Sequence, residues 1–133
     1  MNTVPSTTLR RPAPLRVLVV EDAAVHQRLA SSLLTRQGHF VTVTENGQQA
    51  LDVLESQPFD LVLMDVEMPV MDGLAATNAI RQRESQRGGH LAIVAVTSSS
   101  GPDECLAAGM DAYLPKPLRH DALTQTMQQV LGV

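Results

Sequence analysis

Five residues that could perform chemistry stand where apolar segments of the sequence end. Glu21 and Asp22 follow LRVLVV, and Asp65 follows FDLVLM. Thr97 follows LAIVAV, and Lys116, the only lysine of the chain, lies in YLPKP. Taken singly, an acidic residue at the end of a strand is commonly solvated, and a threonine there commonly caps the next helix. Because these residues recur at the ends of four separate segments, we expect them to form one site.

The residue types define the chemistry that such a site can perform. Three carboxylates that lie close together repel one another and ionise together only beside a cation. Carboxylate oxygens suit Mg²⁺, which binds through one or two carboxylates, several waters and a phosphate. Zinc sites need histidine or cysteine, and the histidines at positions 26, 39, 90 and 120 are scattered, so we expect them at the surface. A carboxylate beside Mg²⁺ that also faces a lysine and a hydroxyl is suited to accept a phosphoryl group as an aspartyl phosphate.

The sequence between these residues alternates between strand and helix patterns. Strands are predicted at residues 15–20, 39–44, 59–64, 91–96 and 111–115. Each is followed by a helical pattern: a stripe from Val25 to Leu34 with Gly38 at its end, residues 50–54, about Gly73 to Glu84, residues 101–108, and a last helix with Leu123, Met127, Val130 and Leu131 on one face. Such alternation indicates βα units and a mostly parallel sheet covered by helices on both faces.

The character of each strand predicts its place in the sheet. Segments 15–20, 59–64 and 91–96 are nearly continuous apolar runs, as expected of central strands. Segment 39–44 alternates and segment 111–115 is short, as expected of edge strands. The fold class that fits is α/β, a flavodoxin-like doubly wound (βα)5 with parallel sheet order 2-1-3-4-5. Its ligand crevice lies at the carboxyl ends of the strands, between the first and the third, where the reactive residues stand.

Composition describes one ordinary globular domain. The 133 residues fall within the size range of one domain. We expect the domain at residues 15–133, because residues 1–14 hold three prolines and no acidic residue and read as a disordered arm or linker. The single Cys105 excludes an intramolecular disulfide and favours a reducing compartment, so a cytoplasmic location is predicted.

Two classes of partner are not expected. The net charge is −4, and no basic cluster exceeds Arg10-Arg11, which argues against nucleic acid. No apolar run approaches the roughly 18–20 residues of a membrane span, so no membrane contact is expected.

Four motifs together, VLVVED, LMDVEMPVMDG, AVT and YLPKP, resemble the receiver domain of the two-component response regulator family over residues 15–131. The resemblance implies that Asp65 is the phosphoacceptor. It further implies a Mg²⁺ site formed by Glu21, Asp22, Asp65 and the backbone carbonyl of Glu67. Thr97 and Lys116 would contact the phosphoryl group, and Thr97 and Tyr113 would be the switch residues. The Lys116-Pro117 peptide bond would be cis.

The same resemblance implies a role in a phosphorelay. The donor would be a phosphohistidine of a histidine kinase or a histidine phosphotransfer domain. The chain would catalyse only its own phosphorylation and dephosphorylation and would then change a partner-binding face made by helix 101–108, strand 111–115 and the last helix. A downstream protein or a second copy would dock there. Residues 1–14 and EMPVMDG favour origin in a hybrid histidine kinase over a free-standing receiver.

Some residues depart from the pattern of the family. Ala23 stands where many hybrid-kinase receivers have asparagine, and Glu67 and Ser99 occupy positions at which the family varies. These departures bear on the lifetime of the phosphoryl group rather than on the existence of the site.

Two alternatives remain open at this level. A degenerate receiver would bind partners without phosphorylation, although such chains usually lack the acidic pair, the acceptor or the lysine. A Mg²⁺-dependent aspartyl-phosphate phosphatase would resemble D-x-D-x-[TV], whereas this chain reads DVEMP from Asp65 and has no room for a substrate-selecting cap.

Overall fold

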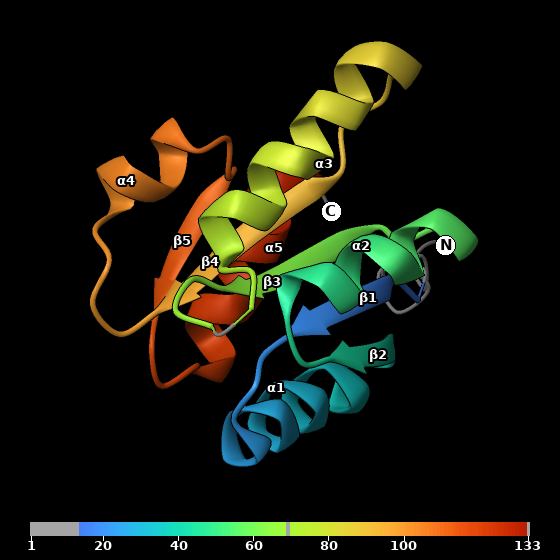
Figure 1. Cartoon of the computed structure of the whole chain (residues 1–133). Coiled ribbons are helices and arrows are strands. Elements are labelled where there is room, and N and C mark those ends of the chain that lie inside the picture. Colours follow the sequence, from blue (N-terminus) through green and yellow to red (C-terminus); the bar gives the residue numbers. More distant parts are fainter. Residues whose placement is uncertain (1–13, 69, 133) are drawn as a thin grey trace.

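The computed structural model describes residues 14–68 and 70–132, which form alternating strands and helices (Figure 1). The predicted arm at residues 1–14 lies outside the described residues, except for Pro14. In chain order the elements are β1 (Arg16–Val20), α1 (Ala24–Arg36), β2 (Phe40–Thr44), α2 (Gly47–Ser56), β3 (Leu61–Asp65), α3 (Gly73–Arg87), β4 (Ala92–Thr97), α4 (Pro102–Ala107), β5 (Ala112–Pro115) and α5 (His120–Leu131).

The strands form one parallel sheet in the order β2-β1-β3-β4-β5, which confirms the predicted topology. The central strands β3 and β4 are buried at every residue, and β1 is buried at every residue except Arg16. The edge strands β2 and β5 keep partly exposed residues. Continuous and alternating apolar patterns therefore distinguished central from edge strands correctly, because only central strands are covered on both faces.

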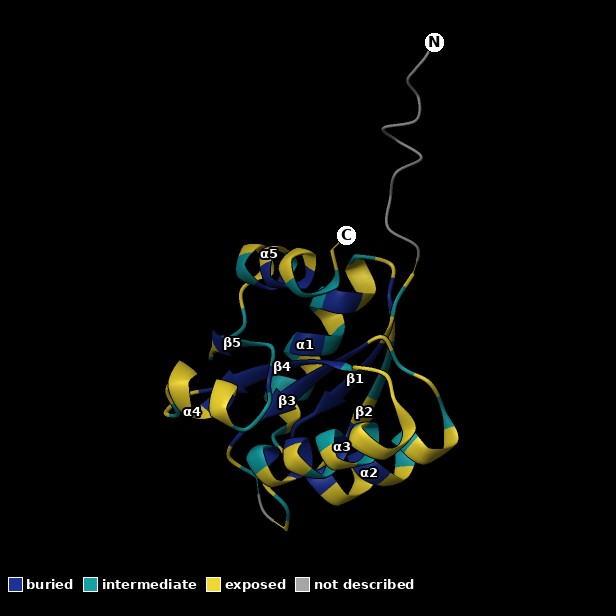
Figure 2. Ribbon diagram, turned by 90° about the horizontal axis from the view of Figure 1, so that it is seen from above, coloured by how far each residue is buried: buried dark blue, intermediate teal, exposed yellow. Residues whose placement is uncertain are grey.

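Helices cover both faces of this sheet. Figure 2 shows α1 and α5 on one side and α2 and α3 on the other, with the dark blue strands between them. Because successive side chains of a strand point to opposite faces, each central strand supplies two cores. Leu18 and Val62 enter the core that also contains Cys105 of α4, whereas Val17 and Leu61 enter the core beneath α1 and α5. Within the described residues, no helix is long and apolar enough to cross a membrane.

The length of α3 differs from the prediction. The helix begins after Asp72, whose side chain accepts a hydrogen bond from the backbone N–H of Ala75 at 2.8 Å, as an N-cap should. It ends at Arg87 rather than near Glu84. Its last turn contributes no buried apolar residue, and Arg87 pairs with Glu55 of α2 at 3.1 Å instead. Apolar periodicity did not predict this turn, because polar contacts hold it.

One of the four histidines is not at the surface as expected. His39 is buried, and its Nδ1 accepts a hydrogen bond from the backbone N–H of Leu15 at 3.0 Å. Burial lowers the pKa of this imidazole, which favours the neutral form that can accept a proton. The sequence pattern missed this role because a histidine that satisfies a backbone donor has no spacing signature.

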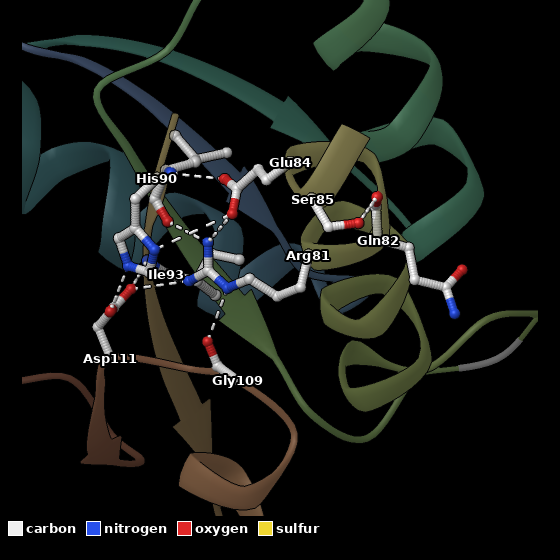
Figure 3. A network of polar contacts seen from close by, with 9 residues as sticks. Arg81, Gln82, Glu84, Ser85, His90, Ile93, Gly109 and Asp111 are labelled. Carbon is white, nitrogen blue, oxygen red and sulfur yellow. Dashed lines mark hydrogen bonds and ion pairs between the residues drawn. The ribbon is translucent and has the colours of Figure 1, made fainter. Parts of the chain in front are cut away.

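A polar network lies at the amino ends of β4 and β5, on the side of the sheet opposite the carboxyl ends of the strands (Figure 3). At its centre, the guanidinium of Arg81 on α3 donates to the carbonyl of Gly109 at 2.8 Å and to Asp111 at 2.9 Å. Asp111 also accepts from the backbone of Ile93 at 2.8 Å and contacts His90 at 2.6 Å. The network therefore ties the end of α4 and the start of β5 to α3.

Close packing at Gly73 places the start of α3 against the end of β3. A Cβ built at Gly73 would overlap the backbone carbonyl oxygen of Asp65 and lie 2.9 Å from Cγ of Met64. Only glycine allows this approach, because neither a backbone carbonyl nor a buried strand can move aside cheaply.

We therefore expect Gly73→Ala to lower the free energy of unfolding by about 3 kcal/mol, near the upper end of the usual cost of overpacking. Gly101→Ala is the matched control, since a Cβ at Gly101 meets nothing within 4 Å. It should cost about 1 kcal/mol or less, because only the preference for glycine over alanine at the N-cap of α4 is lost. Urea unfolding of both variants measures the difference. Equal stability of the two variants would contradict the close approach.

Candidate functional site

The register of the sheet brings the acidic residues together at the carboxyl ends of β1 and β3. Val20 pairs with Met64 in the parallel ladder, so the next residues, Glu21 and Asp65, lie side by side. Both are nearly excluded from solvent, with 4% and 2% of their surface exposed. Asp22 is exposed, yet one oxygen from each of the three carboxylates lies within 4.8 Å of the others. The structure thus forms the acidic cluster from two segments far apart in sequence.

Lys116 bridges the two buried carboxylates. Its Nζ lies 3.0 Å from Oε1 of Glu21 and 3.1 Å from Oδ1 of Asp65. The backbone N–H of Lys116 donates to the carbonyl of Thr97 at 2.9 Å, and the Lys116-Pro117 peptide bond is cis. The lysine is therefore attached to the end of β4 while its ammonium reaches across to β1 and β3.

The proton affinities of these groups follow from burial and from one another. Burial and the neighbouring charge of Glu21 raise the pKa of Asp65 to about 7, although Lys116 opposes the shift. Burial acts to raise the pKa of Glu21 too, but hydrogen bonds from the backbone of Ala23 and from Lys116 outweigh it, so the pKa is lowered. Burial acts to lower the pKa of Lys116, and its two carboxylate partners outweigh that and raise it. One carboxylate of the pair is thus disposed to share a proton unless a further cation is present.

The two oxygens of Asp65 differ in their partners. Oδ1 contacts Lys116 and accepts a long hydrogen bond of 3.3 Å from the backbone N–H of Glu67. Oδ2 is buried and has no hydrogen-bond partner among the described residues. An unpaired buried carboxylate oxygen is costly, and here it sits beside two further carboxylates. This all-oxygen donor set fits a hard divalent cation such as Mg²⁺.

The predicted switch residues occupy the neighbouring strands. Thr97 ends β4 and is 2% exposed. Its hydroxyl donates to Oε2 of Glu67 at 2.7 Å. Tyr113 lies in β5, is partly buried, and packs against the core on the α2 and α3 face. The two side chains therefore lie on adjacent strands, in line with Ala95 pairing Tyr113 and Thr97 pairing Pro115.

Two residues near the site were not predicted. His26 of α1 places Nδ1 3.6 Å from Oε1 of Glu21. Ser100 donates its hydroxyl to Oε2 of Glu67 at 2.7 Å. The position of His26 has a physical basis, because side chains of a helix lean towards its N-terminus, which here adjoins Glu21. The role of Ser100 depends on how a loop folds, which spacing alone does not reveal.

A comparison with known families agrees with this arrangement. The family model of the response regulator receiver domain matches residues 17–128. The chain belongs to the response regulator receiver family. The resemblance inferred from the four motifs is thereby confirmed, and so is the role of the receiver domain as part of a two-component phosphorelay.

Relatives of this receiver domain are large histidine kinases. It is 44% identical over 133 residues to the sensor histidine kinase GacS of Pseudomonas protegens, and this match covers 97% of the present chain and 14% of the kinase. It is 38% identical over 122 residues to hybrid signal transduction histidine kinase I of Dictyostelium discoideum, and this match covers 86% of the present chain and 7% of the kinase. The chain thus spans only a small part of the length of these relatives.

Solved structures of receiver domains share the fold. The receiver domain of sensor histidine kinase PA1611 from Pseudomonas aeruginosa, which holds a magnesium ion in its active site cleft, is 38% identical, with a TM-score of 0.81 and coverage of 91% of this chain and 100% of that chain. The receiver domain of Ssk1 from Saccharomyces cerevisiae, crystallised with the histidine phosphotransfer protein Ypd1, is 28% identical, with a TM-score of 0.81 and coverage of 90% of each chain.

The raised pKa of Asp65 makes stability depend on pH in a defined direction. In the folded receiver domain this carboxyl binds a proton more readily than in the unfolded chain, so stability falls as pH rises from about 3.8 to about 7. Asp65→Asn removes the titration. In metal-free buffer we expect Asp65→Asn to melt at a higher temperature than wild type at pH 8, and the advantage to shrink at pH 5. Thermal melts at the two pH values test this, and an advantage that does not change with pH would contradict it.

Proposed function

We propose that this receiver domain accepts a phosphoryl group on Asp65 from a phosphohistidine of a histidine kinase or histidine phosphotransfer domain, in a reaction that requires Mg²⁺. The observation that carries the proposal is the unpaired, buried Oδ2 of Asp65 beside an acidic cluster and a bridging lysine. These groups would supply a phosphoryl acceptor together with the positive charge that the transfer needs. Cytoplasmic location stays a prediction.

The residues of the site divide the work of phosphoryl transfer. Oδ2 of Asp65 forms the new O–P bond as the N–P bond of the phosphohistidine breaks, and the leaving imidazole keeps the electron pair. Lys116, already bound to Oδ1, supplies positive charge for the transferring oxygens. Glu21, Asp22, Asp65 and the backbone carbonyl of Glu67 would hold Mg²⁺, which supplies further positive charge for the same oxygens and favours the ionised form of the acceptor.

The phosphoryl group is proposed to act on the face formed by α4, β5 and α5. The Thr97 hydroxyl would move to a phosphoryl oxygen, and the Tyr113 ring, on the neighbouring edge strand, would move into the space released. A local charge change needs such a two-state element to produce a distant effect. A downstream protein or a second copy of the domain would bind this face.

The alternatives have less support from the geometry. A phosphorylation-independent interaction module has no need for a lysine that bridges two buried carboxylates, because replacing such a buried arrangement by apolar residues is often stabilising. The relatives suggest that the domain works within a hybrid histidine kinase, and the activity of any longer parent chain is part of this proposal. As a domain, it would turn over no external substrate.

Incubation with Mg²⁺ and acetyl phosphate should add one phosphoryl group to wild type and none to Asp65→Asn, because the amide cannot act as the nucleophile. Intact-mass spectrometry counts the groups. Asp22→Asn is the metal control: it leaves the acceptor and Lys116 in place, so its labelling should fall at low Mg²⁺ and recover in part at high Mg²⁺. Equal labelling of wild type and Asp65→Asn would contradict the assignment of Asp65 as the phosphoacceptor.

Beryllofluoride, a phosphoryl mimic, should shift the backbone amide resonances of residues 97–118 when added with Mg²⁺. Thr97→Ala should still bind the mimic at Asp65 but should leave residues 112–118 close to their free positions, because the moving hydroxyl is absent. Heteronuclear NMR spectra of both proteins measure this. Shifts confined to the loops around Asp65 in wild type would overturn the proposed output face.

A further inference from the structure

The Glu67 side chain forms a second anionic centre next to the acceptor site. Glu67 itself is exposed, but its Oε2 accepts two short hydrogen bonds, from Thr97 Oγ1 at 2.7 Å and from Ser100 Oγ at 2.7 Å. The carboxylate is therefore held by two hydroxyl groups, one at the end of β4 and one in the loop between β4 and α4.

The hydroxyl of Thr97 has no hydrogen left for another acceptor. A hydroxyl donates one hydrogen and accepts up to two. The hydrogen is directed to Glu67, and the oxygen accepts from the backbone N–H groups of Ser99 at 3.2 Å and Ser100 at 2.9 Å. Thr97 can donate to a phosphoryl oxygen on Asp65 only after its bond to Glu67 is broken. The carboxylate and the phosphoryl group thus compete for one hydrogen-bond donor, the Thr97 hydroxyl.

The same carboxylate restrains the N-terminal end of α4. The side-chain hydrogen bonds of segment 98–101 converge on Thr97 and Glu67. The other end of α4 is held independently, since Arg81 binds Gly109 and Asp111 (Figure 3). Breaking the Glu67 contacts therefore frees one end of α4 while the far end stays attached, and this lets the loop follow Thr97.

We propose that Glu67 is a positioning residue that stabilises the resting state of the receiver domain by holding Thr97 and the β4–α4 loop away from Asp65. The carboxylate acts as an internal competitor of the phosphoryl group. The strength of its hydrogen bonds sets how much of the binding free energy of that group is needed to break them and switch the domain. This inference rests on the proposed phosphorylation of Asp65 and on the proposed movement of Thr97. It adds a specific hydrogen-bonded role for the side chain of Glu67, which the sequence connected only with a backbone ligand to the metal and, by its position, with the lifetime of the phosphoryl group.

The test measures the affinity of the full chain for beryllofluoride at saturating Mg²⁺. Removing the competitor with Glu67→Ala should tighten binding about tenfold, as expected for the loss of two hydrogen bonds to a charged group at a partly exposed position. In the unliganded variant, the amide resonances of Ser99 and Ser100 should already move part of the way towards their beryllofluoride positions. The intrinsic fluorescence of Tyr113 gives a second signal, because Tyr113 is the only tyrosine in a chain without tryptophan.

A double-mutant cycle separates positioning from simple charge repulsion. If Glu67 acts through Thr97, then Glu67→Ala in a Thr97→Ala background should tighten binding by no more than about twofold. The Thr97 hydroxyl, for which Glu67 and beryllofluoride compete, is absent from that background. The same tightening in both backgrounds would mean that Glu67 only repels the anion, and would overturn the inference. So would unchanged affinity of the Glu67→Ala single variant.

Ser100→Ala is the milder matched variant. It removes one of the two bonds to Glu67 and leaves the charge in place, so binding should tighten about two- to threefold. This variant decides the question if Glu67→Ala fails to fold, and unchanged affinity would then reject the positioning role. Absence of Asp65-dependent binding of beryllofluoride to wild type would instead reject the proposed function, so the two failures are distinguishable.

Discussion

The bridge from Lys116 to Glu21 and Asp65 is the interaction on which the site depends. Two carboxylates that are almost completely buried would repel each other strongly, and the ammonium at 3.0 and 3.1 Å compensates only part of that cost. The deficit is visible in the pKa of about 7 for Asp65. A buried pair of carboxylates that is short of positive charge favours the binding of a divalent cation. The raised pKa of Asp65 and the fit of the site to a cation therefore have the same electrostatic cause.

The scaffold is rigid where this strain must be borne and loosely held where a response is needed. The parallel register aligns Glu21 with Asp65, and the packing of Gly73 fixes the end of β3. At the opposite edge, Arg81 satisfies several backbone and side-chain acceptors at once. Between these regions, the β4–α4 loop depends on a few hydrogen bonds to one exposed carboxylate. The segment that is proposed to move is thus held mainly by hydrogen bonds at an exposed position, as expected of switching elements.

The accuracy of the sequence-based predictions differed between kinds of feature. Strand order followed from which segments were apolar on both faces, and the acidic cluster followed from the ends of those segments. The last turn of α3 and the burial of His39 were predicted wrongly, because both rest on single polar contacts, Arg87 with Glu55 and His39 with Leu15, that leave no periodic signal. The side chains of His26 and Ser100 were not assigned to the site for the same reason.

What the sequence by itself determined is the fold and the residues that gather at the candidate site. Apolar periodicity specifies which segments are buried, and a parallel sheet then carries Glu21, Asp65, Thr97 and Lys116 to one edge. Only the tertiary structure decided how these groups are paired: that Lys116 spans both carboxylates, that Oδ2 of Asp65 has no partner among the described residues, and that the Thr97 hydroxyl donates a hydrogen bond to Glu67. The physical reason is range. Burial is summed over whole segments and survives in the pattern of residue types, whereas a hydrogen bond forms or fails within a few tenths of an ångström and depends on where the folded chain places each atom.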